Sequence, residues 1–397
     1  MTHISKPKLW VFSEFFFPDE TTTSFIMTKL CNNLVDKYDV RVICGTAILQ
    51  KTQKSDQVLE MNPLVKVTRI KTLKIDKNNS FLRILNFVIL SLSFFYQLIF
   101  SVKSKDKVFT VTNPAIFLVL AGFITSLKKL RITILVHDIF PENTIPAGYI
   151  SNETHIVYQV FKTMFDWSYS RFETIIVLGR DMKYIMESKI ERFHRKPKIK
   201  VIENWADPNI SADNEYVFDN KIVIQYAGNI GAVQGLEGLI HTIKKVKNPQ
   251  VIFEFVGTGK LKEDLEKFSR DNQLKNIIFK PAYSRQDQNA ILNRCSISIV
   301  SLSKGMFGLG VPSKSYNILA AGKPILYIGD KNSEIDLMIQ ENEVGFSFSS
   351  NEEVLNFLNS INIKDEYRLK IMGKKARLLS ETVYSEDFIL ECFKQTI

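Results

Sequence analysis

A repeated alternation of strand-like and helix-like segments constrains the fold of this chain more than any other feature. Short runs rich in Val, Ile and Phe are separated by helical patterns, first in one series and then in a second. Strands that alternate with helices imply βαβ units and a parallel sheet. The expected strands of the two series lie at residues 8–15, 39–45, 65–72, 107–112, 131–140 and 174–179, and at residues 221–229, 251–259, 277–282, 296–302 and 324–330.

The two series predict an α/β protein with two tandem Rossmann-like, doubly wound domains that face each other across a cleft. A basic segment, residues 191–200, is expected to connect them. We expect the first domain over residues 1–200 and the second over residues 201–375. A last helix within residues 376–397, with Ser385 as its N-cap, is expected to pack back on the first domain. Ligands of such folds usually bind in the cleft, where the carboxyl ends of both sheets meet.

The distribution of charge and cysteine indicates partners and compartment. The formal net charge is +10, and residues 1–200 hold 29 Lys and Arg against 17 Asp and Glu. A one-sided basic surface attracts phosphates, and without a zinc-finger spacing or an aromatic RNA-binding run we expect a membrane surface and no nucleic acid. The scattered Cys31, Cys44, Cys295 and Cys392 predict a reducing compartment and no metal cage. Because the N-terminus lacks the apolar core of a signal peptide, we expect a cytoplasmic protein.

Residues 84–102 form a stretch of 19 residues without a charge. That length is sufficient to span a bilayer. Three interpretations remain open: a packed core helix, a helix in the membrane interface, and a true span. A span would interrupt the βαβ series, so it ranks last.

The segment 310–324, GVPSKSYNILAAGKP, predicts an anion site. Pro312 can occupy the first turn of a helix, which leaves the backbone N–H groups of Ser313, Lys314 and Ser315 free to bind an anion. Lys314 would add a positive charge and the serines a hydroxyl. The alternative is an ordinary αβ unit with a capped helix.

Two glycine-rich turns follow expected strands of the second domain. Gly228, Gly231 and Gly235 would let the backbone approach a pyrophosphate closely, although their spacing is not the dinucleotide fingerprint. Gly257 and Gly259 form the second turn. Three such turns in one domain favour a nucleotide site.

The first domain offers polar side chains in the loops after two expected strands. Thr21, Thr22 and Thr23 form a hydroxyl-rich loop that could hold a phosphate, although Thr23 or Ser24 could simply cap the next helix. At the end of another strand, the residues suited to acid–base or sugar-orienting work are His137, Asp138 and Glu142. They too could instead cap a turn.

Seven motifs together resemble the retaining glycosyltransferases of family 4, which have the GT-B fold. The resemblance is to the bacterial branch of L-fucosamine-type transferases of surface-polysaccharide assembly, and it covers nearly the whole chain. The motifs are FFFPDETTTS (15–24), HDIFPEN (137–143), VLGRDMKYI (177–185), VIENWADP (201–208), YAGNIGAVQGLEGLI (226–240), VGTGKLKEDLE (256–266) and VPSKSYNILAAGKPIL (311–326).

The resemblance implies a nucleotide sugar, commonly UDP-linked, on the second domain and the acceptor on the first. No cofactor and no metal are implied. Asp138 would lie near the reacting sugar with His137, and Arg180 would face the cleft from the acceptor side. The other expected acceptor-side residues are Thr21, Thr22, Thr23 and Glu142. Lys314 would assist catalysis by stabilising the leaving diphosphate. The implied donor-binding residues are Gly228, Asn229, Gly231, Gly257, Gly259, Tyr283, Pro312, Ser313, Lys314, Ser315 and Asn317.

The sequence departs from the family pattern at the donor site. Many relatives carry two glutamates eight positions apart where this chain has Leu309 and Asn317. The arginine and lysine that often flank the diphosphate are replaced by Asn229 and Gln234. Asn317 can still hydrogen-bond to ribose hydroxyls, but without charge. Lys314 is the expected source of the missing positive charge.

The resulting hypothesis is transfer of a sugar of the N-acetylhexosamine type from a UDP-sugar to a lipid-linked saccharide. The acceptor would be a polyprenyl-diphosphate-linked saccharide at the inner face of the bacterial plasma membrane, in capsule, O-antigen or exopolysaccharide synthesis. Two alternatives remain. One is a UDP-N-acetylhexosamine epimerase, and the other is a catalytically inactive scaffold bound to the membrane.

Overall fold

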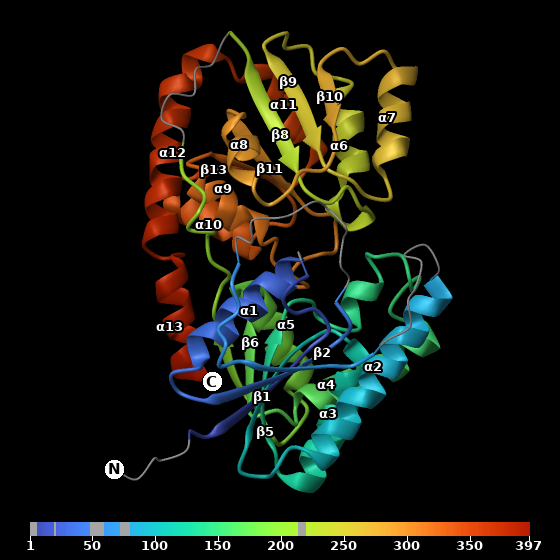
Figure 1. Ribbon diagram of the computed structural model, residues 1–397. Coiled ribbons are helices and arrows are strands. Elements are labelled where there is room, and N and C mark those ends of the chain that lie inside the picture. The colour runs from blue at the N-terminus through green and yellow to red at the C-terminus, as the bar shows by residue number, and fades with distance from the viewer. Residues whose placement is uncertain (1–5, 20, 48–58, 72–79, 213–219) are drawn as a thin grey trace.

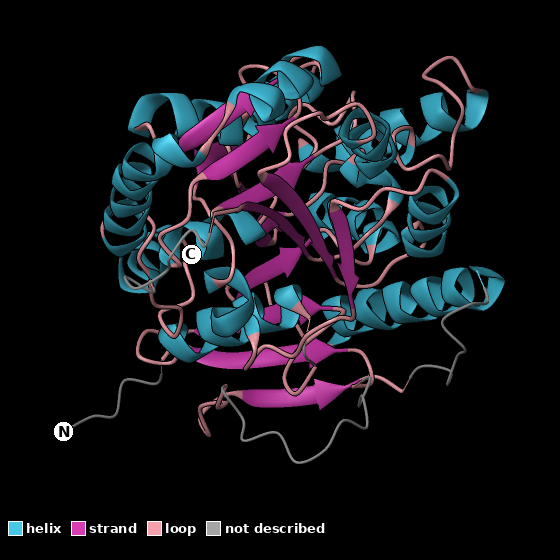
Figure 2. Ribbon diagram, turned by 90° about the horizontal axis from the view of Figure 1, so that it is seen from above, coloured by secondary structure: helices cyan, strands magenta, loops and turns pink. Residues whose placement is uncertain are grey.

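The structure is a computed structural model that describes residues 6–19, 21–47, 59–71, 80–212 and 220–397. These residues form two parallel sheets, each covered by helices on both faces (Figures 1 and 2). This confirms the predicted pair of doubly wound α/β domains.

The first sheet has the strand order β3-β2-β1-β4-β5-β6-β7, and every neighbouring pair is parallel. Its central strands are buried on both faces, as the unbroken apolar run in β5 requires. The strands are β1 (Lys8–Ser13), β2 (Asp39–Cys44), β3 (Lys66–Arg69), β4 (Lys107–Val111), β5 (Arg131–Val136), β6 (Thr174–Val177) and β7 (Lys198–Val201). The helices are α1 (Thr22–Leu34), α2 (Ser80–Phe100), α3 (Ala115–Lys128), α4 (Ile156–Tyr169) and α5 (Arg180–Ile190).

The second sheet has the order β10-β9-β8-β11-β12-β13 and is also parallel throughout. Its strands are β8 (Ile222–Ala227), β9 (Val251–Val256), β10 (Ile277–Lys280), β11 (Ile297–Ser301), β12 (Ile325–Ile328) and β13 (Gly345–Phe348). The helices that follow are α6 (Leu236–Ile243), α7 (Lys262–Asp271), α8 (Gln288–Asn293), α9 (Lys314–Ala320), α10 (Glu334–Asn342), α11 (Asn351–Ser360), α12 (Glu366–Glu381) and α13 (Glu386–Thr396).

The last helix returns to the first domain. In Figure 1, α12 runs along the second domain and α13 continues beside the first. Glu386 at the start of α13 forms a 2.8 Å ion pair with Lys29 of α1 and accepts a 3.2 Å hydrogen bond from the Trp205 indole. The C-terminal helix therefore joins the two domains.

Two strands differ from the sequence-based expectation. β7 lies within the basic segment that was expected to be only a connector, and β13 was not predicted at all. Both are edge strands of four residues. The lysines at alternate positions of β7 are exposed, which is typical of a protected edge strand. Because they alternate with Ile199 and Val201, the strand lacks the continuous apolar run by which the other strands were predicted.

Helix α2 covers most of the uncharged stretch and has one face in the core. Leu90, Phe94 and Leu98 are buried, and the Phe94 ring lies 5.4 Å from that of Phe12 and 5.3 Å from that of Phe117. Among the described residues, α2 included, no helix combines the length and apolar composition that a membrane crossing requires. Of the three interpretations of residues 84–102, the packed core helix agrees with the buried row of Leu90, Phe94 and Leu98.

Candidate active site

A cleft of about 620 Å³ lies between the carboxyl ends of the two sheets. Loops of both domains line it, because every strand of each parallel sheet ends at the same edge. The predicted site residues that line it are Thr22, His137, Asp138, Gly228, Asn229, Gly257, Tyr283, Pro312, Ser313, Lys314 and Asn317. The predicted residues outside its lining are Thr21, Thr23, Glu142, Arg180, Gly231, Gly259 and Ser315.

Lys314 is the most unusual group in the cleft. It is the first residue of α9, and its Nζ atom is buried without a hydrogen-bond partner. The Nζ lies 3.6 Å from the centre of the Tyr226 ring. Burial lowers the pKa of Lys314 to about 7. A buried ammonium group that faces an aromatic ring but no anion is suited to bind an anion that enters the cleft.

The turn before α9 supplies fewer free donors than the sequence suggests. The Ser315 N–H donates to the Pro312 carbonyl at 3.1 Å, and the Ser315 hydroxyl donates to the same oxygen at 2.8 Å. The expectation that Ser315 is free to bind an anion is therefore wrong. Ser313 is the N-cap of α9 and lines the cleft with Pro312 and Lys314.

The glycines of the two turns have different structural roles. Gly228 has φ of +142°, and a β-carbon there would meet only the Lys314 side chain, at 4.0 Å. At Gly257, a β-carbon would lie 1.9 Å from the Gly228 carbonyl oxygen. Gly257 is therefore required by packing between the two turns, whereas Gly228 leaves open space beside Lys314.

Gln234 holds the first of these turns in place. Its side-chain oxygen accepts a 3.1 Å hydrogen bond from the Gly231 N–H, while the Tyr226 hydroxyl donates to the Asn229 carbonyl at 2.6 Å. The neutral residues at positions 229 and 234, where the family that the sequence resembles often has cations, thus leave Lys314 as a buried cation at this end of β8.

Asn317 lines the cleft from α9. Its Oδ1 accepts a 3.0 Å hydrogen bond from the Asp207 backbone N–H. Because that oxygen is occupied, the amide offers its Nδ2 donor to a ligand. Tyr283 lies in the same cleft, whereas Lys280 pairs with Glu254 and is not among the lining residues.

His137 and Asp138 reach the cleft from the end of β5. Their backbone N–H groups donate to the Thr112 hydroxyl at 3.2 and 3.4 Å. Burial lowers the pKa of His137 to about 4 and raises the pKa of Asp138 to about 6. His137 is therefore neutral near pH 7, with a buried Nε2 that has no partner, and Asp138 titrates close to neutrality.

The two domains touch at this loop. The Ile139 N–H donates to the Leu309 carbonyl at 3.0 Å. A β-carbon on Gly310 would lie 3.1 Å from the His137 carbonyl oxygen and 3.4 Å from the Asp138 carboxylate. Gly310 thus allows the turn before α9 to approach His137 and Asp138 of the other domain.

The threonine loop contributes one lining residue, Thr22. Thr21 caps α1 by accepting a 3.1 Å hydrogen bond from the Ser24 N–H. The alternative that Thr23 or Ser24 is the N-cap is therefore wrong, because the N-cap lies two or three residues earlier, at Thr21.

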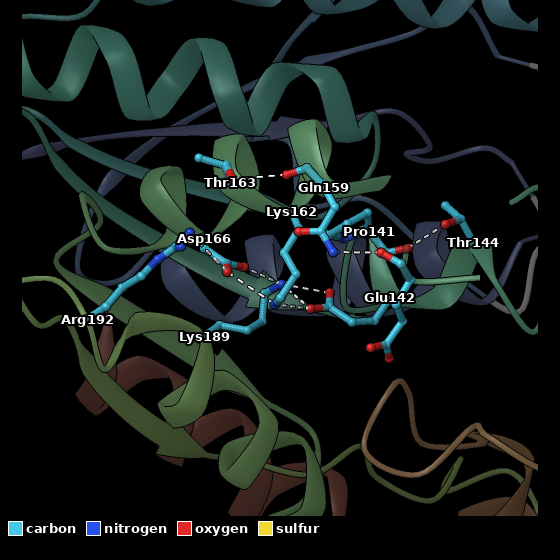
Figure 3. Close-up of polar contacts among 10 residues, drawn as sticks. Pro141, Glu142, Thr144, Gln159, Lys162, Thr163, Asp166, Lys189 and Arg192 are labelled. Carbon is cyan, nitrogen blue, oxygen red and sulfur yellow. Dashed lines mark hydrogen bonds and ion pairs between the residues drawn. The ribbon is translucent and has the colours of Figure 1, made fainter. Parts of the chain in front are cut away.

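Glu142 lies in a network of ion pairs, and Figure 3 shows it pointing toward two lysines. It pairs with Lys189 at 2.6 Å and with Lys162 at 2.9 Å, and both lysines also pair with Asp166. Burial alone would raise the pKa of Glu142, but the two ammonium groups lower it below its ordinary value. The expected acceptor-side role does not fit this position, because the carboxylate is already paired away from the cleft lining.

Arg180 forms a contact between the domains and does not line the cleft. At the start of α5, its guanidinium pairs with Glu334 at 2.9 Å and with Glu341 at 2.7 Å, both on α10. Its backbone N–H also donates to Glu334 at 2.6 Å. The expected position facing the cleft is corrected accordingly.

Sequence reasoning missed a group that crosses the cleft. The Arg285 guanidinium lies 3.5 Å from the centre of the Phe25 ring of α1 and 3.5 Å from the Asp207 carboxylate. All three residues line the cleft. Phe25 directly follows the motif FFFPDETTTS, and Asp207 lies in the motif VIENWADP. No signal in the sequence indicated that Arg285 contacts both residues.

Among the described residues, no three of His, Cys, Asp or Glu gather in a way that could hold a metal ion. No metal ligand is assigned in the cleft. The charged groups available there are protein side chains.

Comparison with known proteins places the chain among enzymes. Residues 210–378 match the family described as glycosyl transferases group 1. The chain is 29% identical over 396 residues to the probable glycosyltransferase WbjE of Pseudomonas aeruginosa, with 97% of this chain and 96% of that protein covered. It is also 29% identical over 174 residues to the putative colanic acid biosynthesis glycosyl transferase WcaI of Escherichia coli K12, covering 41% and 42% of the two chains.

Solved structures share the fold. The Anabaena protein HepE in complex with UDP matches with a TM-score of 0.70 at 15% identity, covering 98% of this chain and 99% of that one. WaaG, a glycosyltransferase involved in lipopolysaccharide biosynthesis, matches with a TM-score of 0.66 at 11% identity and coverage of 98% and 99%. With this GT-B fold, a second domain that matches group 1 and a glycosyltransferase relative of nearly equal length, the chain is a glycosyltransferase.

Proposed function

We propose that the protein transfers a sugar from a UDP-sugar to a lipid-linked saccharide during synthesis of a surface polysaccharide, as in the L-fucosamine-type branch. The names of WbjE and WcaI support glycosyl transfer and polysaccharide synthesis. UDP bound to HepE, a protein of the same fold, supports a UDP-linked donor. The proposed donor is of the N-acetylhexosamine type, and the proposed acceptor is a polyprenyl-diphosphate-linked saccharide on the inner face of the plasma membrane.

The observation that carries this proposal is the unpaired, buried Nζ of Lys314 beside the open turn at Gly228. A diphosphate in this corner would give the ammonium its missing counter-charge and raise its pKa again. The Ser313 turn and the amide of Asn317 lie in the same cleft for the phosphates and the ribose. The donor would thus be held by the second domain.

The proposed reaction needs positioning and charge stabilisation without a metal or cofactor. The bond between the anomeric carbon and the β-phosphate oxygen breaks, and its electron pair leaves with UDP. The acceptor hydroxyl oxygen bonds to the same carbon, and its proton passes to the β-phosphate oxygen of the departing UDP. Lys314 stabilises the developing charge on the diphosphate. Asp138 and the neutral His137 approach from the opposite domain, where the reacting sugar and acceptor would meet; retention of configuration rests on the resemblance.

The test measures transfer from a panel of radiolabelled UDP-sugars into butanol-extractable lipid, with purified protein, bacterial membranes and excess EDTA. Label from one donor is expected in the lipid phase. Lys314→Met, which keeps the length of the side chain without its charge, should lower transfer sharply, while Lys304→Met serves as an exposed control. Epimerised UDP-sugar formed without membranes would replace the proposal with the epimerase, and failure to bind UDP would favour the scaffold.

A further inference from the structure

Helices α2, α3 and α4 expose large apolar side chains on a common side of the first domain, although each also buries a second apolar face. α3 packs beside α2 on one flank and beside α4 on the other. We call their outer side chains the apolar face. Its members are Ile84, Leu85, Leu92, Tyr96, Phe100, Ile116, Phe123, Leu127, Ile156, Val157, Val160, Phe161 and Met164.

The apolar face is not needed for the core. In α2 the buried row is Leu90, Phe94 and Leu98, whereas Tyr96 and Phe100, whose ring centres lie 4.6 Å apart, are 58% and 70% exposed. A helix that covers a sheet in water usually has one apolar stripe and a polar outer face. A contiguous exposed apolar surface across three helices marks a site for a partner or a membrane.

The exposed charges at the ends of α2 and α3 are cationic, whereas Glu153 and Glu173 are exposed beyond the two ends of α4. Asp166 is the only carboxylate in the three helices, and it is 3% exposed and paired with Lys189 and Lys162. At the ends of α2 and α3, the side chains of Lys103, Lys105 and Lys129 are exposed. The Nζ of Lys128 donates to the Ile99 carbonyl, which holds these two helix ends together.

A groove between α3 and α4 adds depth to the surface. It has a volume of about 660 Å³ and is lined by apolar side chains that include Val119, Phe123, Met164 and Trp167. Arg192 also lines it, and its guanidinium is exposed although it lies 3.5 Å from the buried Asp166 carboxylate. An apolar groove with a cation at its edge matches a lipid, whose chain is apolar and whose phosphate is anionic.

We propose that the apolar face lies on an anionic lipid bilayer, with Tyr96, Phe123 and Phe161 inserted at the level of the headgroups. The lysines at the ends of α2 and α3 and Arg192 then meet the lipid phosphates. This surface is distinct from the cleft, but the segment 137–155 leads from Asp138 directly to the start of α4. A lipid-linked acceptor held in the bilayer could thus present its saccharide to the cleft, and in this respect the inference rests on the proposed function.

The competing occupant is a second copy of the chain. Two copies facing each other through this surface would bring the lysine-rich helix ends of each toward the other without exposed carboxylates from the three helices to pair with them. An anionic bilayer satisfies both the apolar and the cationic parts of the surface. The charge pattern therefore favours lipid.

The test is flotation of the full-length protein with vesicles of phosphatidylcholine, with and without phosphatidylglycerol. The wild-type chain should float with the anionic vesicles. The variant Tyr96→Ser/Phe123→Ser should lower the partition coefficient by at least about tenfold, because two aromatic rings no longer insert. A matched control, Tyr367→Ser/Phe388→Ser, removes the same two side-chain types from exposed positions on α12 and α13 and should float like the wild type.

A second variant tests the charges. Lys103→Gln/Lys105→Gln/Lys129→Gln should weaken binding to the anionic vesicles by roughly fivefold per lysine at low salt and reduce its salt dependence.

Three results would each overturn the inference. The first is equal flotation of the wild type and both variants, and the second is no flotation of the wild type. The third is a wild-type dimer that binds no vesicles and that the Tyr96→Ser/Phe123→Ser substitutions dissociate. UDP binding, measured by calorimetry without vesicles, checks folding of the variants. A wild-type protein that floats with anionic vesicles but does not bind UDP would contradict the proposed function and leave the membrane inference standing.

Discussion

At the scale of single residues, the cleft combines groups whose charge states are set by burial. Lys314 lies in the second domain with a depressed pKa, and Asp138 lies in the first with a raised one. Lys314 could be predicted as a site residue from its place between Pro312 and a helix. That its Nζ lacks a hydrogen-bond partner could not be predicted, because this depends on the neutral Asn229 and Gln234 and on the ring of Tyr226.

The first prediction concerns the pH dependence of UDP binding. A diphosphate binds the protonated form of Lys314, and burial lowers the pKa of this group in the free protein to about 7. The ratio of wild-type to Lys314→Met affinity should therefore be large below about pH 7 and decline as the pH rises above it. Isothermal titration calorimetry across this range measures both proteins. A ratio independent of pH would exclude titration of Lys314.

The second prediction concerns Asn317, whose Oδ1 is the acceptor for the buried Asp207 N–H. Asn317→Ala leaves that donor unsatisfied and should lower the free energy of unfolding by about 1–3 kcal/mol. Asn317→Asp retains the acceptor and should restore most of the loss. Urea unfolding of the three proteins provides the measurement. Equal stability of the alanine variant and the wild type would show that water replaces this hydrogen bond.

At the scale of helices and strands, the sequence predicted the alternation well and the edges poorly. β5 has the apolar run of a central strand, whereas β7 exposes a lysine at every second position and β13 has only four residues. Glu142 and Arg180 follow strands and were therefore expected at the cleft. Their side chains instead pair with helices that are distant in sequence, which no local pattern reveals.

The third prediction concerns the buried ion pairs that connect the β5 loop with α4 and α5. Lys189 is 3% exposed and pairs with both Glu142 and Asp166. Lys189→Met leaves the buried Asp166 and the half-buried Glu142 carboxylates with less compensation and should lower the free energy of unfolding by about 3–5 kcal/mol. The variant Glu142→Gln/Lys189→Met should recover part of this loss. Chemical denaturation tests both, and a loss below about 1 kcal/mol would mean that solvent compensates the charges.

At the scale of the whole molecule, the two domains are connected through contacts of the first domain's β5 and β6 loops with the second domain. The backbone contact between Ile139 and Leu309 lies at the wall of the cleft, and Arg180 pairs with Glu334, which is 3% exposed. The alternation of elements predicted two domains, but the contacts that set their separation are long-range. They depend on how the completed domains face each other.

The fourth prediction concerns this separation. Arg180→Ala removes the side-chain link to Glu334 and should broaden the distribution of distances between the domains, while UDP should narrow it again through the cleft. Single-molecule energy transfer between labels placed on α7 and α3 measures this distribution. Lys183→Ala, one turn further along α5, is the control, because its side chain is 43% exposed and pairs within α5, with Glu187. An unchanged distribution in Arg180→Ala would show that the backbone contacts alone fix the spacing.

The return of α13 to the first domain has a consequence for biosynthesis. The ribosome makes α1 before the second domain and α13 after it, yet Lys29 of α1 pairs with Glu386 of α13. During translation, the surface of α1 that receives α13 stays uncovered until the second domain has been synthesised. The nascent first domain therefore exposes this surface of α1 for as long as the second domain is being translated, and its contacts are completed only when α13 has been made.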